Sequence, residues 1–390
     1  MSSFQFRGTI PASKSILNRL LIIRSFDSRF EIDGDSIADD VEKMKGAIEA
    51  IRLGLPADCG AAGTTLRFLA LRASRLKGTH RLVGSARLFE RPQQEIAKLL
   101  EQLGCEVRFE PNALIIEGEG WDIPDTGIVI DRSISSQFAS AVVLSAWDLP
   151  DPLMLQFEGD AVSQGYLQMT LEIVKRAGMW LGVEENSALL IPAGARVRAQ
   201  TVQAEMDVSS AFAIAALAAV DGEATLESWP AKSLQPDSVF PDILKAMGVE
   251  IRGSKSSITI RKPKSLRGVQ WNLKNSPDLF PVLSVLCAVA DSPSALTGAP
   301  HLVHKESARI AKSAELLRLM GAEVEILPDG MKIKPAPAPA VQTVSFDPEH
   351  DHRMAMAGAV ARRAGYPIEI LNKDVVAKSF PEFWTIAGES

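Results

Sequence analysis

Residues 131–147 read DRSISSQFASAVVLSAW, and the two halves of this stretch differ in character. The first half carries small polar side chains, whereas the half from Phe138 to Trp147 is apolar on all sides of a helix. A helix of this kind is buried, and it is too short to cross a bilayer. Its serine-rich start is suited to binding an anion. Taken alone, the segment is more typical of a well-capped core helix than of an anion site.

The same pattern of a polar start followed by an apolar helix recurs along the chain, which changes that interpretation. The later starts, at Ser136, Ser210, Asp278 and His352, recur roughly every 70 residues, which indicates an internal repeat. These later starts include Ser209-Ser210, Ser276-Pro277-Asp278 and Asp351-His352-Arg353, and two earlier starts follow the same rule, Ser13-Lys14-Ser15 and Gly63-Thr64-Thr65.

A second, amphipathic helix accompanies each buried one and ends at a glycine suited to a left-handed C-cap. These helices are predicted within 44–51, 96–103, 167–174, 240–247, 316–320 and 380–384, before Gly54, Gly104, Gly178, Gly248, Gly321 and Gly388. Strand pairs with turns are predicted after three of the glycines, at 105–109 with 113–116, 249–251 with 258–260, and 322–326 with 331–333.

Each repeat is therefore a buried helix, a strand, an amphipathic helix and a hairpin, which predicts an α/β repeat fold. Six repeats divide into two lobes of three, with expected domains of residues 1–12 plus 206–390 and residues 13–205. The last repeat ends without a hairpin, so residues 4–10 are expected to supply a strand there. If the buried helices of each lobe are parallel, their positive N-terminal ends face a central cleft.

Composition restricts the classes of function. The chain is 46% hydrophobic and 23% charged, with a net charge of −6, which argues against a nucleic-acid partner. Cys59, Cys105 and Cys287 lack metal-ligand spacing and are expected to be free thiols. The first residues show no signal peptide, so a cytoplasmic protein without a membrane span is expected.

Charged residues gather at the predicted helix starts and their flanking loops. The cations there suit carboxylate and phosphate groups: Lys14, Arg19, Arg67, Arg87, Lys305, Arg309, Arg353 and Lys378. The acids Asp278, Glu306 and Asp351 share these segments and could perform acid–base chemistry on an anionic substrate. Asp278 and Asp351 could equally be N-caps. His301 and His304 lack partner ligands, so no metal is expected.

Nine motifs resemble the enolpyruvyl transferases, and within them the EPSP synthase family. They are PASKSILNR (11–19), AAGTTLRFL (61–69), GSARLFERP (84–92), SISSQ (133–137), VSQGY (162–166), SPD (276–278), HKESAR (304–309), DHRMAM (351–356) and AKSFPEF (377–383). The resemblance implies six βαβαββ-type units in two lobes. It also implies transfer of the enolpyruvyl group of phosphoenolpyruvate to the 5-hydroxyl of shikimate 3-phosphate, with release of phosphate.

The resemblance also implies roles for particular residues. Asp278 and Glu306 are expected as the acid–base pair, with Lys14 assisting. The shikimate 3-phosphate site is expected to comprise Lys14, Ser15, Arg19, Ser135, Ser136, Gln137, Ser163, Asp278 and Lys305. The phosphoenolpyruvate site is expected to comprise Lys14, Gly63, Arg87, Gln137, Arg309, Arg353 and Lys378. No cofactor and no metal are implied, and the partners are the two small-molecule substrates of a monomer.

Several positions depart from the family pattern. They are Ala12, Ala61, Phe89, His301, Ala308 and His350, none of which removes a charge from the expected catalytic set. Two alternatives remain. The chain could transfer enolpyruvate to another acceptor, such as UDP-N-acetylglucosamine, although the branch specific for that acceptor has Lys-Asn in place of Lys14-Ser15. It could also be a paralogue that binds anions without turnover.

Overall fold

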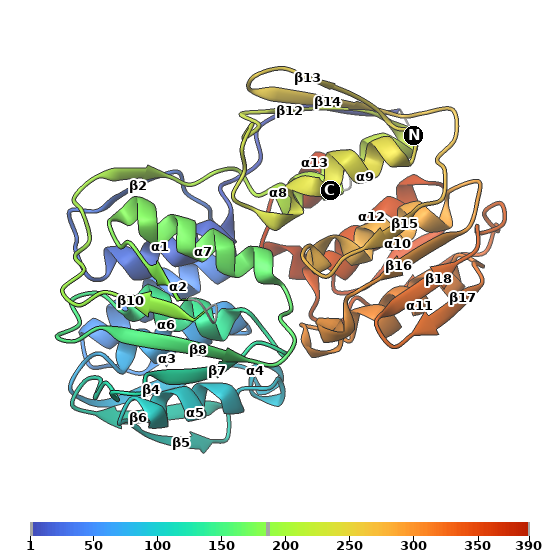
Figure 1. The fold of residues 1–390 in the computed structure, drawn as a ribbon. Coiled ribbons are helices and arrows are strands. Elements are labelled where there is room, and N and C mark those ends of the chain that lie inside the picture. Colours follow the sequence, from blue (N-terminus) through green and yellow to red (C-terminus); the bar gives the residue numbers. More distant parts are fainter. Residues whose placement is uncertain (1–2, 185–187, 389–390) are drawn as a thin grey trace. The chain divides into compact units, whose positions relative to one another are not determined.

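The computed structural model describes residues 3–184 and 188–388, and the chain forms two compact units. Unit 1 comprises Met1–Pro11 and Glu205–Ser390, and unit 2 comprises Ala12–Ala204. In Figure 1 unit 2 runs from blue to green and most of unit 1 from yellow to red. The sequence-based domain limits lie one residue away from these boundaries. Each unit contains two four-stranded sheets and one two-stranded sheet.

The sheets of unit 2 repeat one arrangement. Each four-stranded sheet starts with a parallel pair and continues with antiparallel strands, in the orders β3-β4-β6-β5 and β7-β8-β10-β9. Strand β2 (Glu31–Asp33) pairs in parallel with β11 (Thr201–Gln203). The other strands are β3 (Ala57–Asp58), β4 (Gly78–Val83), β5 (Glu106–Glu110), β6 (Ala113–Gly118), β7 (Ile128–Asp131), β8 (Leu153–Glu158), β9 (Gly182–Val183) and β10 (Leu189–Ile191).

Unit 1 has the same arrangement, with orders β1-β12-β14-β13 and β15-β16-β18-β17 and a parallel pair β19-β20. Its strands are β1 (Phe4–Gly8), β12 (Gly222–Glu227), β13 (Glu250–Gly253), β14 (Ser257–Arg261), β15 (Gln270–Asn272), β16 (Ser294–Thr297), β17 (Val324–Leu327), β18 (Gly330–Ile333), β19 (Val344–Phe346) and β20 (Ile368–Ile370). The mixed α/β repeat expected from the sequence is confirmed.

The expected partner of the N-terminal strand was wrong. Strand β1 pairs in parallel with β12, from Phe4 opposite Gly222 to Gly8 opposite Leu226, rather than with the last repeat. The strand therefore completes the first sheet of unit 1, and the last repeat keeps only the short pair β19-β20. Spacing along the chain predicts that a strand exists, but hydrogen-bonding partners are chosen by tertiary packing.

The six buried helices occur where the repeat predicts them. They are α1 (Lys14–Arg24), α3 (Gly63–Ala73), α6 (Gln137–Ser145), α8 (Val208–Asp221), α10 (Phe280–Ala288) and α12 (His352–Arg363). In α8 only Ser209 and Asp221 are not buried. A helix that is apolar all round can be covered only by other elements, so these helices form the interior of each unit. The first turns of these helices carry five of the expected site residues: Lys14, Ser15, Gly63, Gln137 and Arg353.

The amphipathic helices also match the prediction. They are α2 (Asp39–Arg52), α5 (Gln94–Gln102), α7 (Gln164–Ala177), α9 (Phe240–Ala246), α11 (Arg309–Leu319) and α13 (Phe383–Ala387). All six glycines that follow them have positive φ, from 68° at Gly54 to 117° at Gly178. A residue without Cβ adopts this conformation at little cost, which explains why the helices end there. Shorter helices are α4 (Ala86–Glu90), η1 (Pro236–Val239), η2 (Pro277–Leu279), η3 (Pro300–His304) and η4 (Lys373–Lys378).

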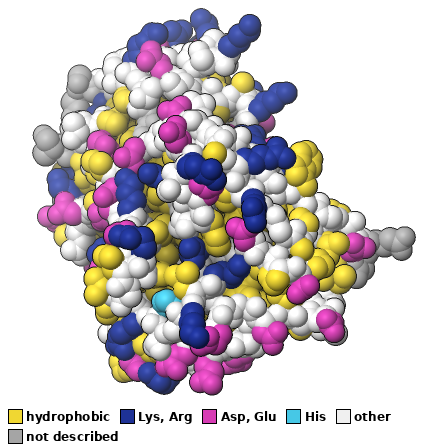
Figure 2. All heavy atoms as spheres, turned by 90° about the vertical axis from the view of Figure 1, so that its left-hand side faces the viewer, with side chains coloured by type: hydrophobic (Ala, Val, Ile, Leu, Met, Phe, Trp, Pro, Cys, Tyr) yellow, Lys and Arg dark blue, Asp and Glu magenta, His cyan; other side chains and the backbone are white. Residues whose placement is uncertain are grey.

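The molecular surface carries charges of both signs. Figure 2 shows basic and acidic side chains close together on the face that it draws. Exposed ion pairs such as Arg52 with Glu49 and Lys43 with Asp58 also bring opposite charges together. Nucleic-acid binding normally requires a basic face. Within residues 3–184 and 188–388, no helix is both long and apolar enough to cross a membrane.

Candidate active site

Helix α1 of unit 2 carries Lys14 and Ser15 in its first turn and Arg19 in its second. The Nζ of Lys14 donates to Oδ2 of Asp40 at 2.8 Å. Arg19 is 2% exposed, and its guanidinium donates to the backbone oxygen of Ser15 at 2.7 Å and to Oγ1 of Thr170 at 2.7 Å. Burial lowers the pKa of Arg19 to about 10, so it remains a cation at neutral pH. Arg19 thereby fixes the start of α1 against α7.

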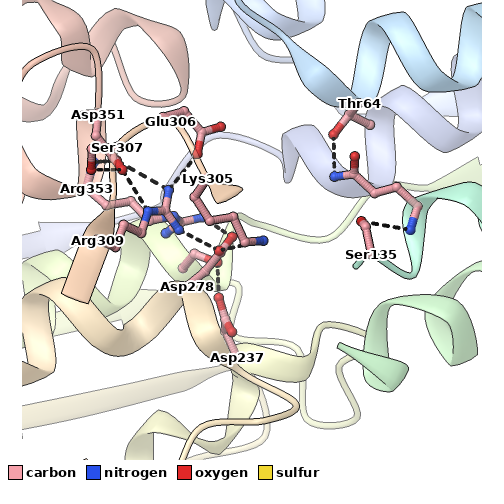
Figure 3. A network of polar contacts seen from close by, with 12 residues as sticks. Thr64, Ser135, Asp237, Asp278, Lys305, Glu306, Ser307, Arg309, Asp351 and Arg353 are labelled. Atoms are coloured by element: carbon pink, nitrogen blue, oxygen red, sulfur yellow. Dashed lines mark hydrogen bonds and ion pairs between the residues drawn. The ribbon is translucent and has the colours of Figure 1, made fainter. Parts of the chain in front are cut away.

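The start of α6 carries the serine run and Gln137. The amide of Gln137 is held at both ends, because Arg67 Nη1 donates to its Oε1 at 2.9 Å and its Nε2 donates to Thr64 Oγ1 at 3.1 Å. The Oγ of Ser135 accepts from the Gln137 backbone N–H at 3.2 Å. Figure 3 draws Thr64 and Ser135 at these contacts. Ser136 is the N-cap residue, but its side chain makes no capping hydrogen bond.

Arg67 is the centre of this group in unit 2. Its guanidinium is 3% exposed, donates to Gln93 Oε1 at 3.1 Å and lies 4.8 Å from the centre of the Phe138 ring. At 3.5 Å, its Nη1 also reaches Ser135 Oγ. A planar donor with several fixed N–H directions can orient two acceptors at once. Arg67 therefore sets the orientation of Gln137 and Ser135, a role that the sequence did not suggest.

Three further predicted residues of unit 2 lie at helix starts or nearby. Ser163 is the N-cap of α7 and has a left-handed backbone, with φ of 51°. Gly63 is the first residue of α3, and a Cβ built there would lie 2.8 Å from Nη1 of Arg91. Arg87 lies on α4, where its Nη1 donates to Oε2 of Glu90 at 3.1 Å. The Gly63 position thus leaves the Arg91 guanidinium close to the helix backbone.

In unit 1, Arg309 is the centre of a cluster of acids. This residue is 1% exposed and begins α11. Its Nη1 donates to Asp278 Oδ1 at 2.8 Å, its Nη2 to Glu306 Oε2 at 3.0 Å, and its Nε to Asp351 Oδ2 at 2.7 Å. Figure 3 shows the three carboxylates around the guanidinium. One buried cation therefore orients both expected acid–base residues.

Asp278 also binds the two other cations of the cluster. Arg353 Nη2 donates to its Oδ2 at 2.8 Å, and Lys305 Nζ lies 3.7 Å from its Oδ1. Asp351 is a cap as well as an ion partner, because its Oδ1 accepts from the Arg353 backbone N–H at 3.0 Å. Ser307 Oγ donates to Asp351 Oδ2 at 3.0 Å. Asp351 is therefore the N-cap of α12 as well as an ion partner of Arg309, whereas the carboxylate of Asp278 faces cations.

The charges around Asp278 fix its protonation state. Burial acts to raise its pKa, but Arg353, Lys305 and Arg309 outweigh that effect and hold the pKa well below its usual range. Burial acts to lower the pKa of Arg309, and the charges of Asp351, Asp278 and Glu306 reverse this and raise it. Burial, followed by the charge of Lys305, lowers the pKa of His301 to about 3. Asp278 is therefore a carboxylate, and His301 is neutral, at physiological pH.

Asp237 lies on the other side of Asp278 (Figure 3) and behaves differently. It is 1% exposed, and Ser209 Oγ donates to its Oδ2. Burial, followed by the charge of Asp278, raises the pKa of Asp237 to about 7. Two neighbouring carboxyl groups with separated pKa values are typical of acid–base sites.

This raised pKa predicts an effect of pH on stability. A carboxyl group whose pKa is raised by folding stabilises the protein at low pH, and the contribution is lost as the pH rises through about 7. Asp237→Asn stays neutral and still accepts from Ser209. Relative to wild type, its free energy of unfolding should therefore rise by about 1–3 kcal/mol between pH 5 and pH 8. Urea denaturation at both pH values measures this, with the exposed Asp242→Asn as control; parallel pH curves for wild type and Asp237→Asn would refute it.

Lys378, the last predicted site residue, is 6% exposed and ends η4. The predicted site residues thus belong to two sets. Unit 2 contains Lys14, Ser15, Arg19, Gly63, Arg87, Ser135, Ser136, Gln137 and Ser163, and unit 1 contains Asp278, Lys305, Glu306, Arg309, Arg353 and Lys378. Sequence reasoning missed Asp40 and Asp237. Their polar partners, Lys14 and Ser209, lie on other elements and are brought close only by folding.

The structure also shows how the potential metal ligands are arranged. Among the residues that it describes, no three His, Cys, Asp or Glu side chains are grouped so that they could hold a metal ion. The acids of unit 1 instead face arginine and lysine side chains.

Comparison with known proteins gives a consistent result. A family model described as EPSP synthase (3-phosphoshikimate 1-carboxyvinyltransferase) matches residues 9–386. A 3-phosphoshikimate 1-carboxyvinyltransferase of Methanoculleus marisnigri is 35% identical over 330 residues, which cover 84% of this chain and 77% of the relative. The protein of the same name from Methanosphaerula palustris is 34% identical over 409 residues, covering 96% and 94%.

A solved structure shares the fold. The EPSP synthase of Acinetobacter baumannii superimposes with a TM-score of 0.76 at 23% sequence identity, covering 99% of this chain and 95% of the other. At this level of identity the likeness concerns the architecture, whereas the family match rests on the sequence.

Proposed function

The chain belongs to the EPSP synthase (3-phosphoshikimate 1-carboxyvinyltransferase) family, and from this premise we propose that it transfers the enolpyruvyl group of phosphoenolpyruvate to the 5-hydroxyl of shikimate 3-phosphate. The single observation that best supports a working enzyme is the cluster in unit 1. There Arg309 orients Asp278, Glu306 and Asp351, and all three acids keep their cationic partners. A paralogue that only binds anions has no need for oriented acids among its cations.

In the proposed reaction, Asp278 accepts the proton of the 5-hydroxyl as its oxygen attacks C2 of phosphoenolpyruvate. The low pKa of Asp278 keeps it ionised and able to accept a hydrogen bond from that hydroxyl. Glu306 delivers a proton to C3, which gives a tetrahedral ketal. C3 then returns a proton to Glu306, the C2–O bond to phosphate breaks, and inorganic phosphate leaves with the proton that Asp278 accepted. Lys14 stabilises negative charge during both steps.

We assign the remaining residues of each unit to the anionic groups of the substrates. In unit 2, Ser135, Ser136 and Ser163 bind the phosphate of shikimate 3-phosphate. Ser15 and Arg19 bind the hydroxyl and carboxylate groups of its ring, and Gln137 contacts both substrates. Lys14, Gly63 and Arg87 bind phosphoenolpyruvate. In unit 1, Lys305 and Asp278 bind shikimate 3-phosphate. Phosphoenolpyruvate is bound by Arg309, Arg353 and Lys378. The helix N-termini at Ser136 and Ser163 support this assignment, because the positive end of a helix dipole favours phosphate.

The choice of acceptor is tested by phosphate release. The purified chain is mixed with phosphoenolpyruvate and either shikimate 3-phosphate or UDP-N-acetylglucosamine. We expect phosphate only with shikimate 3-phosphate. Release with the nucleotide sugar alone would assign the chain to the other acceptor, and thermal stabilisation by both substrates without any release would identify a binding paralogue.

Gly63→Ala is expected to discriminate between phosphoenolpyruvate and glyphosate, an inhibitor that the family resemblance places in the same position. The new methyl group would lie 2.8 Å from Arg91 Nη1 and displace that guanidinium. A longer ligand suffers more, so we expect the inhibition constant of glyphosate to rise about tenfold or more and the KM of phosphoenolpyruvate about threefold. Paired kinetics measure this. Gly46→Ala, with open space around its Cβ, is the control, and equal shifts in both constants would place Gly63 away from the ligand.

A further inference from the structure

A partly buried ion pair joins the starts of two helices in unit 2. Asp40, the second residue of α2, accepts from Lys14, the first residue of α1, at 2.8 Å. Their side chains are 10% and 13% exposed, whereas those of the neighbouring pair Lys43–Asp58 are 44% and 55% exposed. Attraction between charges is stronger where water is excluded, and exposed pairs contribute little. The Lys14–Asp40 pair is therefore the one that can fix a lysine in place.

Asp40 is also connected to the helix start that carries Gly63. Thr65 Oγ1, fully buried in the first turn of α3, lies 3.5 Å from the backbone oxygen of Asp40. Thr64, the preceding residue, accepts from Gln137 at 3.1 Å. Asp40 thus lies where the starts of α1, α2 and α3 meet, and its carboxylate is further favoured by the positive end of α2.

We infer that Asp40 is a positioning residue, which holds the ammonium group of Lys14 at the start of α3 for binding phosphoenolpyruvate. This inference rests on the proposed function. In it Asp40 contacts no substrate and acts only through Lys14. A flexible lysine side chain loses considerable rotamer freedom when it binds an anion, and a carboxylate that already orders the side chain reduces that loss.

A purely structural role for Asp40 makes different predictions. Removing one partner of a buried pair destabilises a protein whatever its function. Such an effect would lower all kinetic constants through the amount of folded protein and would not depend on Lys14. The distinction therefore requires a double-mutant cycle with Lys14, rather than the single substitution alone.

The experiment compares wild type, Asp40→Asn, Lys14→Met, the double variant and the surface control Asp58→Asn. For Asp40→Asn we expect kcat/KM for phosphoenolpyruvate to fall about 10–100-fold and KM for shikimate 3-phosphate to change less than about threefold. The rise in Tm on adding phosphoenolpyruvate with shikimate 3-phosphate should shrink in Asp40→Asn, and it should be the same in Lys14→Met and the double variant. Asp58→Asn should match wild type.

Two outcomes would overturn the inference. One is a further loss of ligand-induced stabilisation when Asp40→Asn is added to Lys14→Met. The other is an equal rise in the KM of both substrates in Asp40→Asn. A wild-type chain without turnover would refute the proposed function instead, and the ligand-induced Tm shifts would still decide the role of Asp40.

Discussion

Asp278→Asn is expected to lower kcat by about 10³-fold or more, the largest effect among the substitutions considered. Asp278 accepts from Arg309 and Arg353 at 2.8 Å, and Lys305 lies within 3.7 Å. The amide cannot accept the proton of the attacking hydroxyl, and loss of a general base alone costs about 10²–10⁴-fold. Steady-state kinetics with both substrates measure the effect.

The same substitution should also reduce stability, because three cations lose their shared counter-charge. Breaking a buried ion pair by removing one partner costs about 3–5 kcal/mol in the free energy of unfolding. Urea denaturation separates this loss from the chemical one, since kcat is measured on the folded fraction. Asp242→Asn removes an exposed acid that pairs with Lys245 and serves as the control. A variant at Asp278 that retains more than about a tenth of wild-type kcat would exclude a catalytic role.

Glu306→Gln should slow turnover about 10²–10⁴-fold while both substrates still bind. The glutamine oxygen can accept from Arg309 Nη2 as Glu306 Oε2 does at 3.0 Å, so the geometry of the cluster is kept. What is lost is the proton for C3 of phosphoenolpyruvate. The measurement pairs kcat with the dissociation constants of the two substrates.

A matched control for Glu306→Gln lies on α11, the helix that follows Glu306 in the chain. Glu315 pairs with Lys312 near the surface of α11, and Glu315→Gln should leave kcat unchanged. If Glu306→Gln loses less than about tenfold in kcat, Glu306 serves only as a partner of Arg309. Weaker binding of both substrates with unchanged kcat would point to the same conclusion.

Local features of the fold could be predicted from the sequence. Buried helices such as α8 are apolar on all sides, and glycines such as Gly178 mark the ends of amphipathic helices, so a short window contains the whole signal. The partner of β1 could not be predicted in this way. Strand pairing depends on contacts between residues far apart in the chain, as between Phe4 and Gly222.

In the candidate site, too, local features could be predicted from the sequence, whereas contacts between distant residues could not. The polar helix starts contain Lys14, Asp278 and Arg353, and their residue types alone point to anion binding. The partners that orient them are remote in sequence: Asp40 lies 26 residues from Lys14, and Asp351 lies 42 residues from Arg309. Asp237 looks like an ordinary acid in the first turn of a short helix, and only its burial beside Asp278 raises its pKa.

The most direct test of enolpyruvyl transfer by this chain follows the reaction in D2O by proton NMR. Phosphoenolpyruvate and shikimate 3-phosphate are incubated with wild-type enzyme. Addition–elimination protonates C3 from an acid in exchange with solvent and then removes a proton from the resulting methyl group. The account predicts a new enolpyruvyl ether whose vinyl group is partly deuterated, together with free phosphate. An absence of product, or a product whose vinyl group contains no deuterium, would contradict it.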